Sequence, residues 1–358
     1  MRVGYTIWKA QDLPNLPRIL ETIDPLVNYY VIVIPFTITR KNVLKLRGGM
    51  FIKFPLQITR VAPALIDTRK PVWIKVQLHP YAPDLPDDLV PKWWPGYVFS
   101  NPGNTGAILK VVTQSIIESI ESAGLAVEGC IFATELAYMT AHRRFVRHMQ
   151  RFIDWLKQHN KGYIKVTYGS NFWQPLRWRY RWIIDFCYHW GFGSAIVKSI
   201  LKGTPYENAN PKILADIAYN SFDENANMVW QQGDYTGLSA YFYPSMSDPG
   251  KIRSAYEKYR FGLFWSFRYA EVAKQWAEYW NKPLMVTEAG VLYNSPIAKL
   301  PSPTREWAIN DWYYITLKEF ERHGCTNFTI WEDHESLLCV EGLARYIREK
   351  QDKEAKHA

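Results

Sequence analysis

Long apolar runs, a leader-like N-terminus and paired cysteines are all missing from this sequence. No apolar run reaches the roughly 18 residues that a membrane-spanning helix needs, so we expect no membrane partner. The N-terminus, MRVGYTIWKAQDLP, carries charge but no apolar segment followed by a small-residue cleavage site. We therefore expect a cytoplasmic protein, or a secreted one if the chain is a trimmed mature form.

Cysteine is scarce, and its spacing excludes the usual frameworks. The four cysteines are Cys130, Cys187, Cys325 and Cys339, and no two of them form a C-x-x-C pair. In a chain this long, such spacing argues against a disulfide framework or a structural zinc site, and it predicts ordinary, mostly buried thiols.

Metal-ligand patterns are missing as well. The first expected strand has no His-x-His, and the acidic cluster EDHE at 332–335 lacks the H-E-x-x-H spacing of a zinc helix. We predict no metal and no other cofactor.

Positive charge is in excess, with a net charge of +9. Lysine and arginine are nevertheless spread along the chain, and the tightest cluster is RWRYRW at 177–182. Alternating aromatic and basic residues could stack nucleic-acid bases. We favour a solvated segment anchored by its aromatic rings and expect no nucleic-acid partner. A basic RNA- or DNA-binding protein remains an alternative, which steeply salt-dependent binding would favour.

Aromatic residues are abundant, with 16 Trp and 23 Tyr. Several lie in loop-like stretches, such as 93–97 and 171–173. An aromatic ring offers a flat apolar face with a polar edge, which matches the apolar C–H face of a sugar. Trp173 is therefore a candidate sugar platform, although any one tryptophan can equally fill a core.

Strand-like and helix-like segments alternate along the chain. Strands are expected at 3–8, 29–36, 72–79, 128–135, 163–168, 235–243, 283–288 and 326–331. Helices are expected at 15–24, 56–69, 107–124, 143–162, within 251–281, and at 305–324 and 340–353. The continuous β-branched run at 29–36 is typical of a strand covered on both faces. The strongly amphipathic pattern at 143–162 predicts a surface helix.

Eight strands alternating with helices predict a parallel sheet with crossover helices, which at this length favours one (β/α)8 barrel domain over 1–358. An open doubly wound sheet is the alternative. That fold usually has a Gly-rich first turn, which VGYTIWKAQ lacks. Residues 174–222 are expected to form a helical insertion between the fifth and sixth strands.

Active sites of such barrels lie at the carboxyl ends of the strands. The residues expected there are Trp8, His79, Thr134, Glu135, Asn171, Tyr241, Tyr243, Glu288, Trp331 and Glu332. Two carboxylates, Glu135 and Glu288, suit glycosidic cleavage, because one must protonate the leaving oxygen while the other attacks or activates water. Small residues after Glu288 would leave room for a sugar ring. The alternative is that these glutamates cap helices or pair with arginine.

Four segments resemble the clan A retaining glycoside hydrolases, and within that clan family 113, the β-mannanases. The segments are IFATEL, VTYGSNFW, DYTGLSAYFYP and PLMVTEAGV, in the family's order, between about 128 and 291. Two features depart from the family's pattern. Phe172 is inserted before Trp173, and the stretch at 174–222 is longer than expected.

The resemblance implies a role for each matching residue. Glu135 would be the general acid/base and Glu288 the nucleophile of a retaining reaction, with Tyr241 holding Glu288. Trp331 would form the floor of the subsite for the sugar that is cleaved. The other implied substrate contacts are Thr134, Asn171, His79, Trp173, Trp8 and Tyr243.

The partner expected from these residues is a β-linked glycan, with an endo-β-1,4-mannanase-like activity as the leading hypothesis. A glycosidase acting on another β-glycan, such as β-glucan, stays open. So does a carbohydrate-binding barrel without catalysis, although the intact glutamate pair weighs against it.

Overall fold

The computed structural model describes nine stretches of the chain. They are residues 1–7, 14–36, 57–78, 102–134, 143–170, 229–242, 269–291, 300–332 and 337–357. The expected helical insertion at 174–222 lies outside these ranges.

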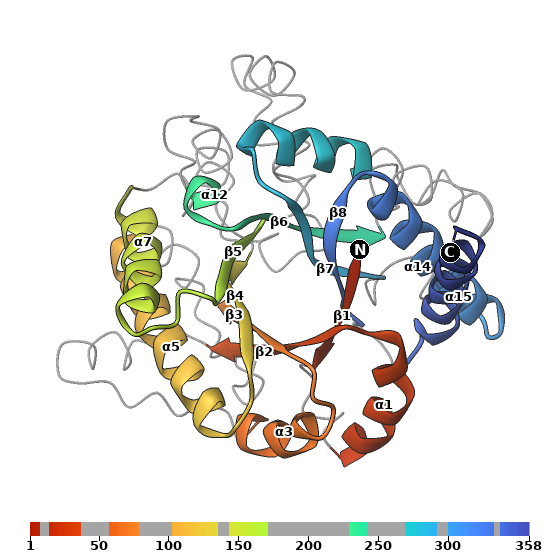
Figure 1. Cartoon of the computed structure of the whole chain (residues 1–358), viewed down its shortest axis with the longest axis horizontal. Helices are drawn as coiled ribbons and strands as arrows, with labels where there is room; N and C mark the ends of the chain where they lie inside the picture. The colour runs from red at the N-terminus through yellow and green to blue at the C-terminus, as the bar shows by residue number, and fades with distance from the viewer. Residues whose placement is uncertain are drawn as a thin grey trace. The chain divides into compact units, whose positions relative to one another are not determined.

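Eight parallel strands form a closed barrel in the order of the chain, with helices between them (Figure 1). The strands are β1 (Arg2–Ile7), β2 (Tyr29–Phe36), β3 (Val72–Leu78), β4 (Val127–Thr134), β5 (Lys165–Ser170), β6 (Tyr235–Phe242), β7 (Leu284–Val291) and β8 (Cys325–Ile330). The predicted (β/α)8 barrel is confirmed.

The longer described helices overlap the segments where the spacing of apolar residues predicts helices. They are α1 (Leu16–Ile23), α3 (Gln57–Ile66), α5 (Pro102–Ser122), α7 (Arg143–Gln158), a helix over 269–280, α14 (Thr304–Arg322) and α15 (Val340–His357). The short α12 (Val229–Gln232) and the 3-10 turn η2 (Asp24–Leu26) were not predicted. None of the helices in the described ranges is long and apolar enough to cross a membrane.

Contacts along the chain gather into two compact units. The first comprises Met1–Ile32, Thr59–Trp73 and Tyr235–Ala358. Its interior is aromatic, because the Tyr29 ring lies 6.1 Å from Trp73 and the Trp73 ring 5.8 Å from Tyr235. Gly4 on β1 makes this possible, since a Cβ there would lie 2.2 Å from the Tyr29 ring.

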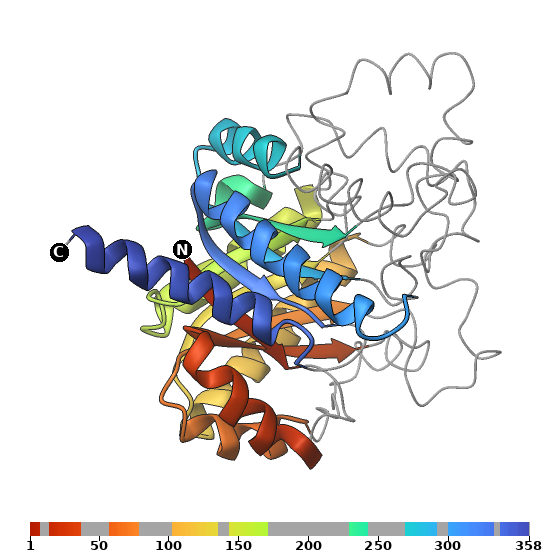
Figure 2. The same cartoon turned by 90° about the vertical axis from the view of Figure 1, so that its right-hand side faces the viewer.

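The outer helices of the first unit pack through polar side chains as well as apolar ones. In Figures 1 and 2, α14 and α15 lie side by side. The guanidinium carbon of Arg345 lies 3.8 Å from the centre of the Tyr314 ring, and Lys318 forms an ion pair of 2.9 Å with Glu349. Gly342 permits close approach, because a Cβ at that position would lie 2.1 Å from the Asn310 carbonyl oxygen.

The second unit comprises Val33–Ile58 and Ile74–Asp234. In it α7 buries one face, and the Phe152 ring lies 5.2 Å from Phe132 on β4. The residues of that face are Phe145, Val146, Met149, Phe152 and Leu156.

The expected burial of the thiols holds wherever the structure describes them. Cys130, Cys325 and Cys339 are all buried, and burial raises the pKa of each thiol. Cys187 lies outside the described residues.

Candidate functional site

Glu288 lies within β7 and is almost fully buried, with 1% of its surface exposed. The Tyr241 hydroxyl on the neighbouring strand β6 donates a hydrogen bond to one carboxylate oxygen of Glu288. The two strands are in register with Ser239 opposite Glu288 and Tyr241 opposite Gly290. The structure therefore brings together two of the residues that the sequence predicts at this end of the barrel.

A bulge directs Glu288. Between β6 and β7 the register steps from Leu238↔Val286 to Ser239↔Glu288, so β7 advances by one residue more than its neighbour. The pairing with β8 shows the same extra residue between Val286 and Ala289. The inserted residue is Thr287, whose hydroxyl donates to the Leu238 carbonyl at 3.1 Å. Bulges of this kind re-aim a side chain and recur beside active sites.

The other strand expected to carry a catalytic carboxylate has a similar irregularity. Between β4 and β5 the register steps from Ile131↔Thr167 to Thr134↔Gly169, so β4 also gains one residue just before its end. Thr134 is buried, and its hydroxyl has no hydrogen-bond partner among the described residues. Glu135 follows at once but lies outside the described residues.

The small residues after Glu288, Ala289 and Gly290, pack against the chain at the end of β8 and do not border an open space. A Cβ at Gly290 would lie 2.1 Å from the carbonyl oxygen of Trp331. The Trp331 N–H donates to Ala289 at 2.7 Å, and the Tyr313 hydroxyl donates to the Trp331 carbonyl at 3.1 Å. The space beside Gly290 is thus filled by the backbone of Trp331, which corrects the expectation that it would admit a sugar ring.

Those contacts fix the backbone of Trp331 from both sides. The residue is buried, with 6% of its surface exposed. Strand β7 was expected to end at Glu288, but it continues to Val291. The close approach of β7 to Trp331, the residue directly after β8, therefore depends on the missing side chain of Gly290.

Glu332, immediately after Trp331, is a second buried carboxylate of this region, and no catalytic or binding role was predicted for it. One of its oxygens accepts the Tyr5 hydroxyl and the Leu337 N–H at 2.6 Å each, and the other accepts the Cys339 N–H at 2.7 Å. Burial raises the pKa of Glu332, while these donors act in the opposite direction. The carboxylate ties the end of β8 to β1 and to the start of α15.

This arrangement gives Glu332 a structural role that the sequence does not reveal. The sequence places it at the end of the eighth expected strand and as the first residue of the EDHE cluster, whose other members lie outside the described residues. Two of its partners are backbone N–H groups, and because every residue except proline has one, the sequence does not indicate these contacts. Within the described ranges, His, Cys, Asp and Glu side chains form no group of three or more that could hold a metal ion.

Lys75 on β3 is another residue that sequence reasoning missed. It is fully buried, with an exposed fraction of 0%, and charged side chains are almost never fully buried unless they are paired. In the run VWIKVQL the lysine stands in the middle of an otherwise mostly apolar strand. This position could have predicted its burial.

Several predicted site residues cannot be placed. They are Glu135, His79, Trp8, Asn171, Trp173 and Tyr243, and all lie outside the described residues. Of the predicted site residues, the structure describes Glu288, Tyr241 and Trp331, which belong to the first unit, and Thr134, which belongs to the second.

Solved structures that resemble this chain include glycoside hydrolases. A family 5 mannosidase from Rhizomucor miehei matches with a TM-score of 0.51 at 11% sequence identity, over 98% of this chain and 94% of that one. An endo-β-1,4-mannanase from Thermotoga petrophila matches with a TM-score of 0.49 at 12% identity, over 97% and 76%. No protein-family model and no curated protein sequence matches the chain. The likeness to the mannosidase shows the barrel fold.

Proposed function

We propose that the protein is a retaining β-glycoside hydrolase, with Glu288 as nucleophile and Glu135 as general acid/base. The observation that carries the proposal is the buried Glu288 carboxylate, set next to a bulge and held by the Tyr241 hydroxyl. A hydroxyl that donates to a buried carboxylate satisfies one of its oxygens and fixes the orientation of its plane. A carboxylate held in one orientation suits attack on a bound sugar.

The chemistry follows from these roles. Glu288 would attack the anomeric carbon while Glu135 protonates the leaving glycosidic oxygen, giving a glycosyl ester on Glu288. Glu135, now ionised, would then deprotonate a water molecule that attacks the same carbon, and the ester bond to Glu288 would break. Two inversions retain the configuration of the sugar. Tyr241 would act as a positioning residue for Glu288.

The finer proposal is a β-mannan-type substrate, with endo action. Support for this comes from the four segments that resemble the family 113 β-mannanases. Trp331 would form part of the floor beneath the sugar at the cleaved bond, and the Thr134 hydroxyl, which is unpaired among the described residues, would accept or donate a hydrogen bond to a sugar hydroxyl.

The test is release of reducing sugar from β-mannan, β-glucan, xylan and aryl β-glycosides by the wild type and by Glu288→Gln. Glutamine keeps the size of the side chain but cannot act as the nucleophile. The matched control is Glu354→Gln, because Glu354 is exposed on α15. Thermal unfolding of all three proteins establishes that each is folded.

Cleavage of one glycan class that is lost in Glu288→Gln and kept in Glu354→Gln would support the proposal and identify the sugar. Equal activity of all three proteins would overturn the assignment of Glu288. Glycan binding without release of sugar by the folded wild type would overturn catalysis and favour the carbohydrate-binding barrel.

A further inference from the structure

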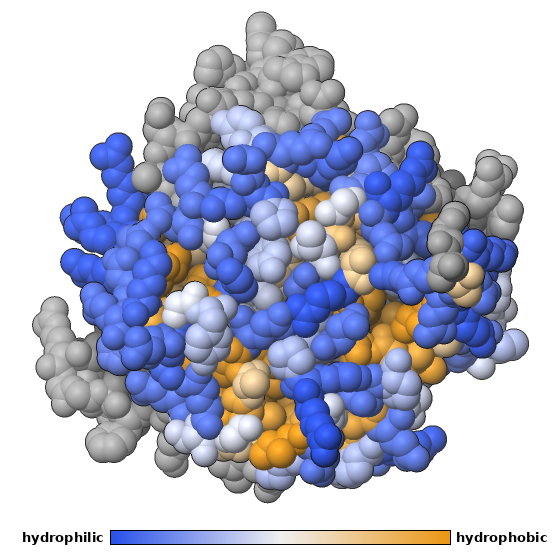
Figure 3. Space-filling view, viewed as in Figure 1, coloured by the Kyte–Doolittle hydropathy of each residue, from blue (hydrophilic) through white to orange (hydrophobic). Residues whose placement is uncertain are grey.

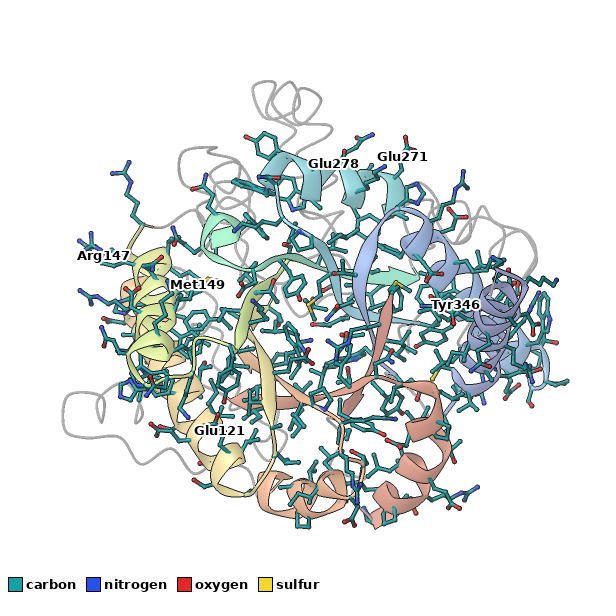
Figure 4. The ribbon with its side chains drawn as sticks, viewed as in Figure 1. Glu121, Arg147, Met149, Glu271, Glu278 and Tyr346 are labelled. Atoms are coloured by element: carbon teal, nitrogen blue, oxygen red, sulfur yellow. The ribbon has the colours of Figure 1, made fainter. Side chains whose placement is uncertain are left out.

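Basic side chains gather on the exposed face of α7 in the second unit. Arg144, Arg147 and Arg151 are exposed, and their spacing of three and four residues places them on one face of the helix. Figure 4 shows Arg147 pointing outward, while Met149 points toward the strands and is fully buried. Figure 3 shows hydrophilic side chains gathered over α7, at the left of the view.

The first turns of α5 complete this surface. A Cβ at Gly103 would lie 3.4 Å from the Cβ of Arg144, and a Cβ at Gly106 would lie 3.1 Å from the Cβ of His148, so the two helices meet closely there. Together they line a hollow of about 360 Å³. Its lining residues are Gly103, Asn104, Ala107, Arg144, Arg147, His148 and Arg151. We call this the α5–α7 hollow.

Positive charge in the hollow is not balanced by the described carboxylates. Two lysines of the same unit do form ion pairs, Lys161 with Glu121 and Lys165 with Asp234. No ion pair joins Arg144, Arg147 or Arg151 to an acidic side chain in the described part of the chain. The unpaired guanidinium groups are therefore available to a ligand.

The pKa of His148 is sensitive to the positive charges around the hollow. The pKa of its ring is lowered by burial and then by the positive charges of Arg151, Lys110 and Arg147. These three cations come from both helices, so the positive potential belongs to the hollow as a whole. The start of α5 adds the partial positive charge of a helix N-terminus. An anion in the hollow would relieve this repulsion.

We propose that the α5–α7 hollow binds the acidic groups of an anionic glycan, a chain that bears carboxylate or sulfate. Guanidinium groups present paired N–H donors that match the oxygens of either group. The choice of a glycan over another polyanion rests on the proposed glycoside hydrolase function in its coarser form, a β-linked glycan substrate, and not on the finer proposal of a neutral β-mannan.

The test compares two triple variants that remove the same charge. The first is Arg144→Gln/Arg147→Gln/Arg151→Gln. The matched control is Arg18→Gln/Arg322→Gln/Arg348→Gln, since these arginines are also exposed but lie in the other unit. Dissociation constants are measured at low and high salt for polygalacturonate, dextran sulfate, neutral β-mannan and single-stranded RNA. Hydrolysis of a neutral aryl glycoside is measured in parallel.

The expected result is salt-dependent binding of polygalacturonate or dextran sulfate that weakens about tenfold or more in the hollow variant, since each lost charge-assisted contact contributes on the order of 1.4 kcal/mol, a factor of ten. The control variant should lose much less. Comparison of the two polymers then distinguishes carboxylate from sulfate. As a second readout, bound polymer should raise the pKa of His148, followed by NMR of its ring protons.

Equal weakening in both triple variants would overturn the proposal in favour of a general charge effect. Tighter RNA binding with the same loss in the hollow variant would assign the surface to nucleic acid instead. Absence of any anionic-glycan binding would also overturn it. Aryl-glycoside hydrolysis should be unchanged in both variants. If it is undetectable in the wild type while glycan binding depends on the hollow, the hydrolase proposal fails and the binding site stands.

Discussion

Replacement of Glu332 by glutamine should destabilise the protein by about 2 kcal/mol. The carboxylate accepts hydrogen bonds on both oxygens, from Tyr5 and Leu337 on one and from Cys339 on the other. Glutamine has a single acceptor oxygen, so its NH2 group must face at least one buried N–H. A lost hydrogen bond to a charged group accounts for about 1.5–3 kcal/mol, and the remaining bonds become neutral and weaker. Removal of a buried charge offsets part of this loss.

The assay is urea unfolding at pH 7, with Glu354→Gln on the exposed face of α15 as the control. The variant should lower the midpoint without a change in slope, because the surface exposed on unfolding stays the same. The control should stay within about 0.5 kcal/mol of the wild type. If Glu332→Gln were as stable as Glu354→Gln, the carboxylate would not hold the end of β8 in the way described.

The pH dependence gives a second readout of the same group. Because burial raises the pKa of Glu332, the folded state keeps its proton at pH values where the unfolded chain has lost it. The free energy of unfolding of the wild type should therefore decrease as the pH rises from the ordinary glutamate range through the raised pKa. This decrease should be missing in Glu332→Gln. A wild type that gains stability over this interval, by comparison with the variant, would contradict the raised pKa.

Further predictions concern the neighbours of Glu288. Gly290→Ala should lower the free energy of unfolding by about 1–3 kcal/mol or more, because the added Cβ would lie 2.1 Å from the Trp331 carbonyl oxygen. The assay is urea unfolding. The control is Gly162→Ala, where the nearest atom to the added Cβ lies at 3.7 Å. Tyr241→Phe should lower kcat/KM on the glycan by about 10–100-fold, the value of one hydrogen bond to a charged group. An unchanged kcat/KM in folded Tyr241→Phe would refute a role for the hydrogen bond in positioning Glu288.

Much of the barrel could be predicted from the sequence because buried parallel strands leave a clear pattern. The apolar run at 29–36 coincides with β2, and the amphipathic run at 143–162 contains α7. Boundaries were less predictable where apolar spacing was the only guide. Helix α5 begins at Pro102 rather than 107, since proline and polar residues suit the first turn of a helix but interrupt its apolar pattern.

One contact between two candidate site residues could be predicted from the sequence, but the strand geometry around it could not. Glu288 and Tyr241 were predicted together and are in contact. The bulge at Thr287 depends on how β7 pairs with both of its neighbours, and no local pattern in the sequence encodes that register. Gly290 shows the same limit, because its small size indicates close packing but does not say whether a sugar or the backbone of β8 fills the space.

Covalent trapping of a sugar on Glu288 is the most direct test of the proposed mechanism. A panel of 2-deoxy-2-fluoro-β-glycosides with activated leaving groups, in manno, gluco and xylo configurations, would slow breakdown of the glycosyl ester so that it accumulates. Mass spectrometry of the digested protein should then find one sugar on the peptide that contains Glu288, and none in Glu288→Gln. A sugar attached to another carboxylate, or glycan cleavage that continues undiminished in Glu288→Gln, would contradict Glu288 as the nucleophile.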